Sequence, residues 1–577
     1  MDNVDTLRRQ IEVARGLRPA DLLLKGGKVV NVFSGEVQQT NVAICNGRIT
    51  GVGDYYHDGI EVCDAGGLFL IPGLIDAHVH IESSMLSPAE YARAVLPHGT
   101  TTIICDPHEI ANVMGLEGIR YILDSSKNIP LNLFVTVPSC VPATHLETSG
   151  AIISPAEIEE LFRWDRVIGL AEMMNVPGVL RGNLNELEKI LIARQRGCPI
   201  DGHSPSLSGK DLNAYIGLGV HSDHESTSRE EAAEKLRLGM YLMIREGSAA
   251  RNLEELLPVV TPATDNRCMF VSDDRHPRDI LSEGHMDHIL RKGVRLGMNP
   301  IIALKMATIN PARAFMRSHI GAIAPGYRAD IVLVNDLEGF VVRTVIKDGE
   351  IVVRDGEMII DLPHGIDGRA RKTIRVKDLS LDRFKIRISG NRVRIIELIA
   401  GQVYTRQVIE NVSVRENKEV VADPARDLLK IAVIERHCAT GNIGLGFVRG
   451  FGLQNGALGS SVAHDSHNII VVGTNDRDMQ LAARKIIEMG GGHVVTSEGK
   501  ILGGLPLPIA GLLSDRSLEE LVSEEERLLA AARGLGARPV SPFIRLSFLA
   551  LPVIPELKIT DKGLIDVNRF EIIDIEP

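Results

Sequence analysis

The segment LIPGLIDAHVH, from Leu70 to His80, is the first of a series of apolar runs separated by helix-like stretches. Such alternation is typical of βα units and predicts a parallel sheet. The eight predicted strands are Leu70–His80, Thr100–Pro107, Asn132–Ser139, Val167–Met174, Pro199–Ser204, Val220–Glu225, Tyr241–Glu246 and Met269–Asp274. Eight such units fit a (β/α)8 barrel, a fold of about 250 residues. The motif Ser-Pro-Ala-Glu at Ser87 and Ser154 predicts helix starts, because serine caps a helix and proline fits its first turn.

Two β-rich segments flank this predicted barrel. Asp21–Gly53 and Gly321–Met358 contain short apolar runs separated by Asn-Gly, Asp-Gly and Pro-Gly turns. We expect residues 1–70 and 318–363 to form one composite β-sandwich beside a barrel of residues 71–317. Residues 364–577 predict a third, C-terminal α/β domain, with a helix over Ser517–Arg533.

The composition favours a multidomain enzyme. A length of 577 residues exceeds the size of a single core, and 44% hydrophobic with 24% charged residues is ordinary for a globular protein. The net charge of −11 argues against nucleic acid as a partner. No apolar run approaches the roughly 20 residues that span a bilayer, so we expect no membrane partner.

The start of the chain and the cysteines predict a cytoplasmic location. Asp5 and Glu12 lie near the start, without the apolar stretch of a secretory signal. The seven cysteines form no CxxC pair, which favours reduced thiols. We also expect a homo-oligomer.

The end of the first predicted strand carries metal-binding chemistry. Side chains alternate along a strand, so Asp76, His78 and His80 should share one face, and two imidazoles at this spacing can bind one divalent ion. Catalytic groups of a barrel collect at the C-terminal ends of its strands. Polar residues also stand at other strand ends: Glu172, His203, His224, Asp273 and Asp274. Together these side chains predict a site for one or two metal ions.

The sequence blocks around these residues resemble a known family. PGLIDAHVH (Pro72–His80), with PGYRADIV (Pro325–Val332) after the barrel, resembles the metal-dependent amidohydrolase superfamily. More narrowly, a further set is similar to adenine deaminases of the bacterial type: HIESSM (His80–Met85), CDPHEIANV (Cys105–Val113), GHSPSLSGKDLNAY (Gly202–Tyr215), SDHEST (Ser222–Thr227), REGSAARNL (Arg245–Leu253), SDDRHP (Ser272–Pro277) and LPLPIAGLLSD (Leu505–Asp515).

The resemblance implies two divalent metal ions, expected to be Mn²⁺, with Fe²⁺ or Zn²⁺ as alternatives. Many members of the superfamily bridge their metals with a carboxylated lysine on the fourth strand, and this sequence has Glu172 there. The resemblance then implies the following ligands: His78, His80 and Asp273 for one metal, His203 and His224 for the other, and Glu172 as the bridge. His221 should lie on the opposite strand face from these ligands.

The resemblance further implies hydrolytic deamination of adenine to hypoxanthine and ammonia, in purine salvage. Asp273 should take a proton from the activated water, with Asp274 as the alternative if the strand register differs by one residue. A second acid must protonate the ring nitrogen, and the candidates are Glu82, Glu109 and Glu246.

Recognition of the purine requires polar groups above the barrel. Arg245, Glu246 and Ser248 end the seventh strand and are candidates for it. Residues after the second strand, Asp106, His108 and Glu109, could line the pocket or bind an extra metal.

In the C-terminal segment, the glycines between Gly441 and Gly456 favour tight turns over a phosphate loop. His464 and His467, which follow them, could provide a metal or substrate contact at the mouth of the barrel, but a structural role is the simpler interpretation.

Two other functions compete with this prediction. A cyclic-amide hydrolase of the dihydroorotase or hydantoinase kind would share the barrel and the metal site. A non-enzymatic barrel scaffold would have lost ligands, and none of the expected ligand positions is lost here.

Overall fold

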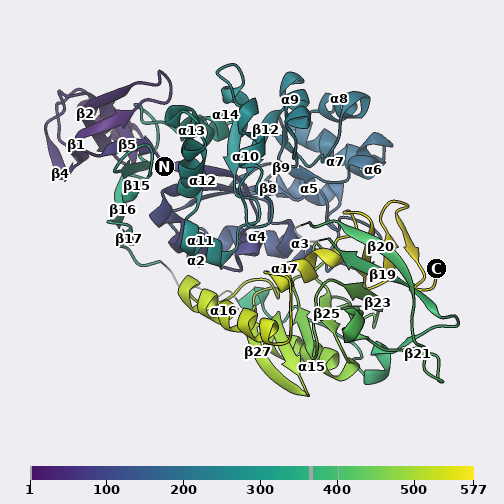
Figure 1. The fold of residues 1–577 in the computed structure, drawn as a ribbon. Coiled ribbons are helices and arrows are strands. Elements are labelled where there is room, and N and C mark those ends of the chain that lie inside the picture. Colours follow the sequence, from purple (N-terminus) through teal and green to yellow (C-terminus); the bar gives the residue numbers. More distant parts are fainter. Residues whose placement is uncertain (1–2, 363–367, 400–401) are drawn as a thin grey trace.

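The computed structural model describes residues 3–362, 368–399 and 402–577. Figure 1 shows a β-sheet at one end, a central set of strands among helices, and a C-terminal part packed against the central one. The domain boundary predicted at 363/364 lies outside the described residues.

The central part contains parallel strands in each of the eight predicted regions. They are β6 (Leu74–Val79), β7 (Thr100–Cys105), β8 (Asn132–Val137), β9 (Val167–Met173), β10 (Ile200–Gly202), β11 (Ser222–Asp223), β12 (Tyr241–Arg245) and β13 (Cys268–Val271). They form a five-stranded sheet, in the order β10-β9-β8-β7-β6, and a three-stranded sheet, β11-β12-β13. Parallel bridges between Val79 and Asp273 and between Ile200 and Val220 join the two sheets at both edges. The curled parallel sheet therefore brings its strand ends together.

Helices follow most of these strands. They are α2 (Pro88–Val95), α3 (His108–Met114), α4 (Leu116–Ser125), α5 (Pro155–Leu161), α6 (Val176–Leu180), α7 (Leu184–Gln195), α8 (Gly209–Gly217), α9 (Arg229–Arg237), α10 (Leu253–Leu256), α11 (Pro277–Glu283), α12 (Met286–Arg295), α13 (Pro300–Met306) and α14 (Ile309–Ala314). Ser87 and Ser154 cap α2 and α5 as predicted, each accepting a hydrogen bond from the backbone N–H three residues later.

The predicted first strand is wrong in extent, because it is two strands. β5 (Phe69–Pro72) pairs with the N-terminal sheet, and only β6 belongs to the parallel one. Gly73 separates them: its N–H donates to the Asp330 carbonyl at 2.8 Å. A Cβ at Gly73 would lie 2.1 Å from Thr101 Oγ1, so only glycine fits this crossing between the two sheets.

The N-terminal sheet unites segments from both sides of the central part. A short helix, α1 (Val4–Ala14), precedes it, and its nine strands are β1 (Ala20–Val30), β2 (Val37–Cys45), β3 (Arg48–Val52), β4 (Gly59–Asp64), β5, β14 (Ile331–Val334), β15 (Val342–Lys347), β16 (Glu350–Arg354) and β17 (Glu357–Met358). The predicted Asn-Gly turn is present, with Asn46 and Gly47 at φ of 52° and 70°. The strands pair in one continuous sheet around a shared apolar core, where a two-sheet sandwich was expected.

The C-terminal part is built on an eight-stranded sheet. Its order is β20 (Thr405–Asn411), β19 (Arg392–Leu398), β23 (Ile443–Arg449), β22 (Leu429–Ile434), β25 (Ile469–Gly473), β24 (Ala457–Ser460), β26 (Gly492–Ser497) and β27 (Lys500–Pro506). Smaller elements are β18 (Ile386–Arg387), β21 (Glu419–Val420), β28 (Leu557–Thr560), β29 (Gly563–Asp566) and β30 (Glu571–Ile573). The helices are α15 (Asp476–Met489), α16 (Leu518–Gly534) and α17 (Pro542–Ser547), and α16 has the predicted capping box of Ser517 and Glu520.

The glycines of this part serve two purposes. Gly441, Gly450, Gly452 and Gly456 have positive φ, as the predicted tight turns require. Gly444 lies within β23, where a Cβ would lie 1.9 Å from the Thr560 carbonyl oxygen. Close packing of β23 against the β28–β29 hairpin therefore explains the glycine within the strand.

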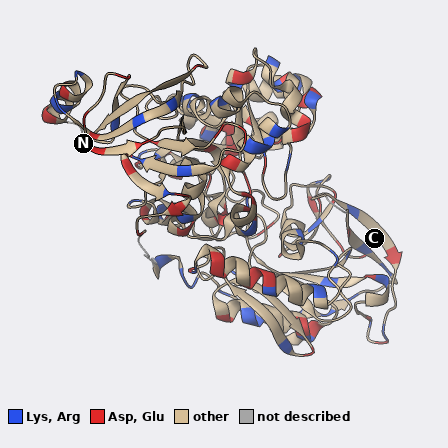
Figure 2. Cartoon of the chain, turned by 60° about the vertical axis from the view of Figure 1, so that its left-hand side comes forward, with Lys and Arg blue, Asp and Glu red and all other residues tan. Residues whose placement is uncertain are grey.

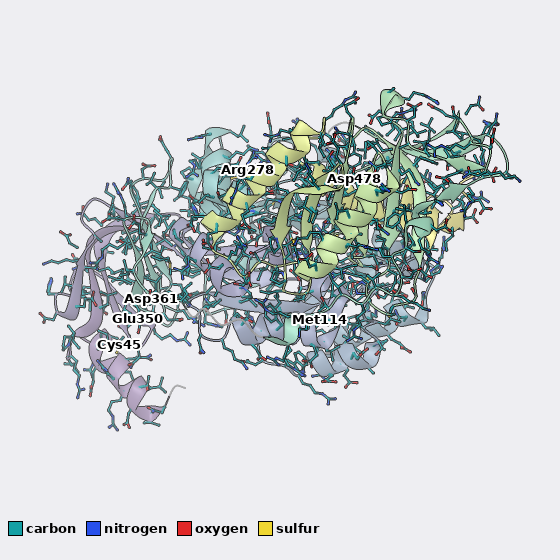
Figure 3. All side chains as sticks on the ribbon, turned by 90° about the horizontal axis from the view of Figure 1, so that it is seen from below. Cys45, Met114, Arg278, Glu350, Asp361 and Asp478 are labelled. Atoms are coloured by element: carbon teal, nitrogen blue, oxygen red, sulfur yellow. The ribbon has the colours of Figure 1, made fainter. Side chains whose placement is uncertain are left out.

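The C-terminal part packs directly on the central part. Thr148 donates hydrogen bonds from its N–H and Oγ1 to the Asp561 carboxylate, at 2.9 and 2.7 Å. Viewed from below, Figure 3 shows Asp478 of the C-terminal part and Cys45 of the N-terminal sheet at opposite sides, with Arg278 of α11 beside α16. The C-terminal part therefore covers the central one and leaves the N-terminal sheet apart.

Acidic and basic residues are interspersed along the ribbon in the view of Figure 2. Within the described ranges, no helix has the length and apolar character that a bilayer span requires.

We predict that Gly73→Ala destabilises the protein, because the new Cβ must displace Thr101. Overpacking of this kind costs about 1–3 kcal/mol. Gly217→Ala is the matched control. Gly217 ends α8, and apart from its own helix backbone and chain neighbours none of the described residues comes within 4 Å of the place that its Cβ would take. Stability should therefore be unchanged or slightly higher. Denaturant midpoints would measure both changes, and equal midpoints for the two variants would contradict the packing argument.

Candidate active site

Two histidines at the end of β6 face each other through their Nε2 atoms. His78 Nδ1 donates to Asp201 Oδ2 at 2.9 Å, and His80 Nδ1 donates to the Asp106 carbonyl at 2.9 Å. With the protons on Nδ1, both Nε2 atoms present lone pairs, only 3.2 Å apart. Two lone pairs held so close repel each other unless one nitrogen is protonated or a metal ion lies between them. The pair therefore fits a metal ion, oriented in the usual way by acceptors behind each ring.

The Glu172 carboxylate, at the end of β9, connects this pair to two further histidines. Its Oε2 lies 2.6 Å from His203 Nδ1 and 3.1 Å from His224 Nε2, while Oε1 lies 3.5 Å from His80 Nε2. Each oxygen thus faces different histidine nitrogens. Among the described residues, His224 Nδ1 has no hydrogen-bond partner.

Asp273, directly after β13, completes the group around the first pair. Its Oδ1 lies 3.2 Å from His80 Nε2 and 3.7 Å from His78 Nε2. Asp274 instead accepts a hydrogen bond from Ser83 Oγ at 2.5 Å. Asp273 is also in the left-handed region, at φ of 56°, a conformation that only a defined local environment maintains.

Both carboxylates are held in the ionised form that metal ligands need. Burial alone would raise the pKa of Glu172, but the adjacent His203 and His224 hold that pKa well below its usual range. Burial likewise opposes ionisation of Asp273, and the contacts with His80 and Arg245 hold its pKa well below the usual range.

Two carboxylates in this region support the ligands, and the sequence did not reveal their contacts. Asp201 orients His78 and accepts a hydrogen bond from Ser222 Oγ at 2.7 Å. Asp76 was expected on the same face as the histidines, but it accepts from Ser272 N and Oγ, at 3.1 and 2.5 Å, and so supports the residue before Asp273. The only sequence signal for Asp201 was its position two residues before His203.

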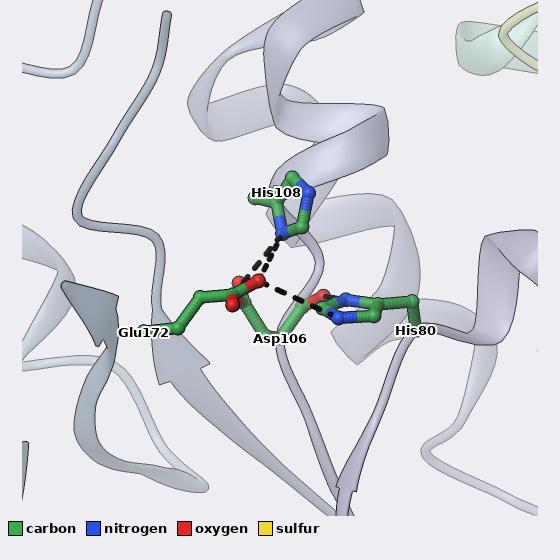
Figure 4. A group of neighbouring side chains, drawn as sticks. All are labelled: His80, Asp106, His108 and Glu172. Carbon is green, nitrogen blue, oxygen red and sulfur yellow. Dashed lines mark hydrogen bonds and ion pairs between the residues drawn. The ribbon is translucent and has the colours of Figure 1, made fainter. Parts of the chain in front are cut away.

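Figure 4 shows His108 and Asp106 beside His80 and Glu172. His108 Nδ1 lies 3.2 Å from Asp106 Oδ2 and 3.4 Å from Glu172 Oε1. His108 was predicted to bind substrate, and it does line the same cavity as Glu172.

Arg245, predicted to bind substrate, lines the same cavity as Glu172. Its guanidinium forms a bidentate pair with Glu225 and donates to Asp273 Oδ2 at 3.0 Å. Ser248 lines the cavity, but its Oγ donates to Asp279 Oδ2 at 2.5 Å.

The three candidate acids differ in location. Glu109 lines the main cavity, whereas the cavity wall does not include Glu82 or Glu246. Burial and the neighbouring Glu109 raise the pKa of Glu82 to about 7, and its Oε1 accepts from the Ile110 N–H. Glu246 is fully buried and paired with Lys292.

His221 lies apart from these ligands, as expected. Its Nδ1 contacts the Ile200 carbonyl at 2.6 Å, and its ring packs against Tyr241 and Phe315.

The cavity has a volume of about 2330 Å³, which exceeds the 300–1,000 Å³ typical of small-molecule sites. Residues of both the central and the C-terminal part line it, including His464 and Asp465. The C-terminal part therefore forms a wall of the site.

Comparison with known proteins gives matches over nearly the whole chain. Residues 69–352 match the amidohydrolase family, and residues 402–571 match the adenine deaminase C-terminal domain. A protein of Desulfatibacillum aliphaticivorans described as adenine deaminase is 50% identical over 567 residues, covering 98% of this chain and 99% of that one. A protein of Dehalococcoides mccartyi with the same description is 49% identical over 570 residues, covering 99% of this chain and 99% of that one. One of Methanothrix thermoacetophila is 49% identical over 561 residues, covering 97% of this chain and 98% of that one. The chain belongs to the adenine deaminase family of amidohydrolases.

Proposed function

We propose that the chain catalyses the hydrolytic deamination of adenine to hypoxanthine and ammonia, in purine salvage. The observation that carries the proposal is the Glu172 carboxylate, whose two oxygens face different histidine nitrogens. The full-length similarity to proteins described as adenine deaminase supports the same conclusion. The cyclic-amide alternative has no comparable support.

The proposed ligand set holds two divalent ions, with Mn²⁺ as the expected metal and Fe²⁺ or Zn²⁺ as alternatives. His78, His80 and Asp273 would hold one ion, His203 and His224 the other, and Glu172 would bridge them. Imidazole and carboxylate donors suit these metals. Bound metal would supply a hydroxide near neutral pH, by lowering the pKa of water from 15.7 to about 7.

Asp273 is the proposed base that accepts the proton of the attacking water and passes it towards the leaving ammonia. Its Oδ2 is fixed by Arg245, so the carboxylate cannot turn away from the site. Arg245 thus acts as a positioning residue, while His108 and Ser248 line the space for the base. Glu82, Glu109 and Glu246 stay the candidates for the second acid. Of these, Glu109 lines the cavity, but its pKa lies well below the usual range, so it suits a substrate-binding acceptor better than a proton donor.

The arrangement of the strands also supports proposals on the closure of the barrel and on the domain bounds. The two bridged parallel sheets would form a closed (β/α)8 barrel over residues 71–317, with the composite β-domain of 1–70 and 318–363 and the α/β domain of 364–577 beside it. We also propose a cytoplasmic homo-oligomer.

We predict about two metal equivalents per chain after loading with Mn²⁺. Glu172→Gln keeps the shape of the side chain but weakens the bridge, so at least one equivalent and most activity should be lost. Elemental analysis and the adenine assay would measure both. Glu147→Gln is the matched control, because burial already raises the pKa of this cavity carboxyl well above its usual range. Full activity without bound transition metal would refute the metal site.

We predict that Asp273→Asn lowers kcat by orders of magnitude, since the amide cannot accept the proton. Asp274→Asn should be much milder, because Asp274 is bonded to Ser83 rather than directed at the histidines. Steady-state kinetics at equal metal content separates the two. A larger loss of kcat in Asp274→Asn than in Asp273→Asn would show that Asp274 is the ligand.

We predict that free adenine is turned over far better than adenosine, AMP or cytosine. The imidazole ring of adenine carries an N–H that can donate a hydrogen bond to an ionised carboxylate such as Glu109. In adenosine a ribose replaces this hydrogen, so the hydrogen bond is lost. The test is a comparison of kcat/KM for adenine, adenosine, AMP, cytosine, guanine and dihydroorotate. A preference for dihydroorotate would move the chain to the cyclic-amide class.

A further inference from the structure

The turn between β24 and β25 carries two histidines from the C-terminal part to the active site. His467 is fully buried and His464 nearly so. The turn is anchored on both sides: the His467 carbonyl accepts from the buried Arg436 guanidinium, and Asn468 Nδ2 donates to the Thr148 carbonyl of the central part at 2.8 Å. Its position against the central part is therefore fixed by hydrogen bonds.

Both histidines contact the same carboxylate, that of Glu109. His464 Nδ1 lies 2.7 Å from Glu109 Oε1, and His467 Nε2 contacts Oε2. The contact of His464 joins residues 355 positions apart in the chain. The sequence did not predict these contacts of His464 and His467 with Glu109.

The proton positions identify the cluster as a hydrogen-bonded one. The Ala463 N–H donates to His467 Nδ1 at 3.2 Å, so this nitrogen is an acceptor and the proton of the neutral ring is on Nε2. The Nε2 nitrogen that carries this proton is in contact with Glu109 Oε2. Although a metal could be drawn among these three side chains, it would need the Nε2 lone pair, and the proton would move to Nδ1, against the Ala463 N–H.

The charges agree with this geometry. Burial opposes protonation of His464, but the adjacent Glu109 carboxylate raises the pKa of His464 to about 9. Burial lowers the pKa of His467 to about 4, so this ring is neutral. The two histidines hold the pKa of Glu109 well below its usual range. Glu109 is therefore a carboxylate acceptor near neutral pH.

Glu109 retains capacity for a ligand. A carboxylate accepts about four hydrogen bonds. His464 Nδ1 supplies one, and His467 Nε2 and His108 Nε2 also contact the Glu109 oxygens. Glu109 also lines the main cavity together with His108 and Glu172. A donor on the purine can reach such a carboxylate only if its orientation is kept.

We propose that His464 and His467 are positioning residues, which hold Glu109 in place as the hydrogen-bond acceptor for an N–H group of the purine base. The inference rests on the proposed deamination of adenine, and it gives the C-terminal part a direct role in substrate binding.

The test uses the full-length, Mn²⁺-loaded protein and a set of substitutions matched to the contacting nitrogens. His464→Ala and His467→Ala remove the donors. His464→Asn and His467→Gln keep a donor near the positions of Nδ1 and Nε2, respectively. His493→Ala is the control: His493 is also buried in the C-terminal part, and its ring packs on Phe543, 4.7 Å between centroids.

We expect each alanine variant to raise the KM for adenine and the inhibition constant of hypoxanthine about tenfold or more, because a hydrogen bond to a charged group is lost. The kcat should change less, and the metal content should stay at the wild-type level. His464→Asn and His467→Gln should recover most of the affinity, and His493→Ala should match the wild type. In a double-mutant cycle, His464→Ala should add little to Glu109→Gln, because the histidine acts through that carboxylate.

Unchanged KM and hypoxanthine inhibition in both alanine variants would overturn the inference. So would Asn and Gln variants as poor as the alanine variants, full additivity with Glu109→Gln, or a metal equivalent lost from His467→Ala. If the wild-type protein deaminates adenine and the variants give any of these results, the inference fails and the proposed function stands. A wild-type protein that holds two metals and does not deaminate adenine would remove the proposed function, and the inference with it.

Discussion

The contact on which the site depends is the one between the Glu172 carboxylate and the imidazoles around it. A buried carboxylate is stable only with compensating charge or hydrogen bonds, and Glu172 has histidines on both of its oxygens. The same contacts hold its pKa well below the usual range. A plain glutamate can therefore take the place that a carboxylated lysine has in many amidohydrolases.

The curled sheet makes this convergence possible. Glu172 ends β9 in the five-stranded sheet, whereas Asp273 follows β13 in the three-stranded one. The bridge between Val79 and Asp273, at the sheet edge, places the aspartate directly beside the end of β6. Gly73 starts β6 from the crossing between the two sheets, so the geometry of the histidines depends on a residue with no side chain.

Much of this arrangement was predictable from local rules. Period-2 alternation and the meeting of parallel strand ends predicted the group of His78, His80, Glu172, His203 and Asp273, because both rules depend only on the backbone. The partners of Arg245 were not predictable. Glu225 and Asp273 accept hydrogen bonds from its guanidinium only because the fold brings the ends of different strands together.

The features that the sequence could not predict depend on contacts between residues far apart in the chain. His464 reaches Glu109 across 355 positions in the chain, and no local pattern reports such a contact. The sequence also could not divide Leu70–His80 into two strands, because the reason is the packing of Thr101 against Gly73. Side-chain contacts between parts of the chain, rather than secondary structure, were what the sequence lacked.

The central claim is that unmodified Glu172 joins two metal ions through its separate oxygens. Anomalous diffraction from crystals of the Mn²⁺-loaded protein tests it most directly. The account predicts two manganese peaks about 3.5–4 Å apart, the usual spacing of a two-metal site, with Oε1 of Glu172 on one and Oε2 on the other. A single peak, or two peaks with both oxygens of Glu172 on one ion, would contradict it.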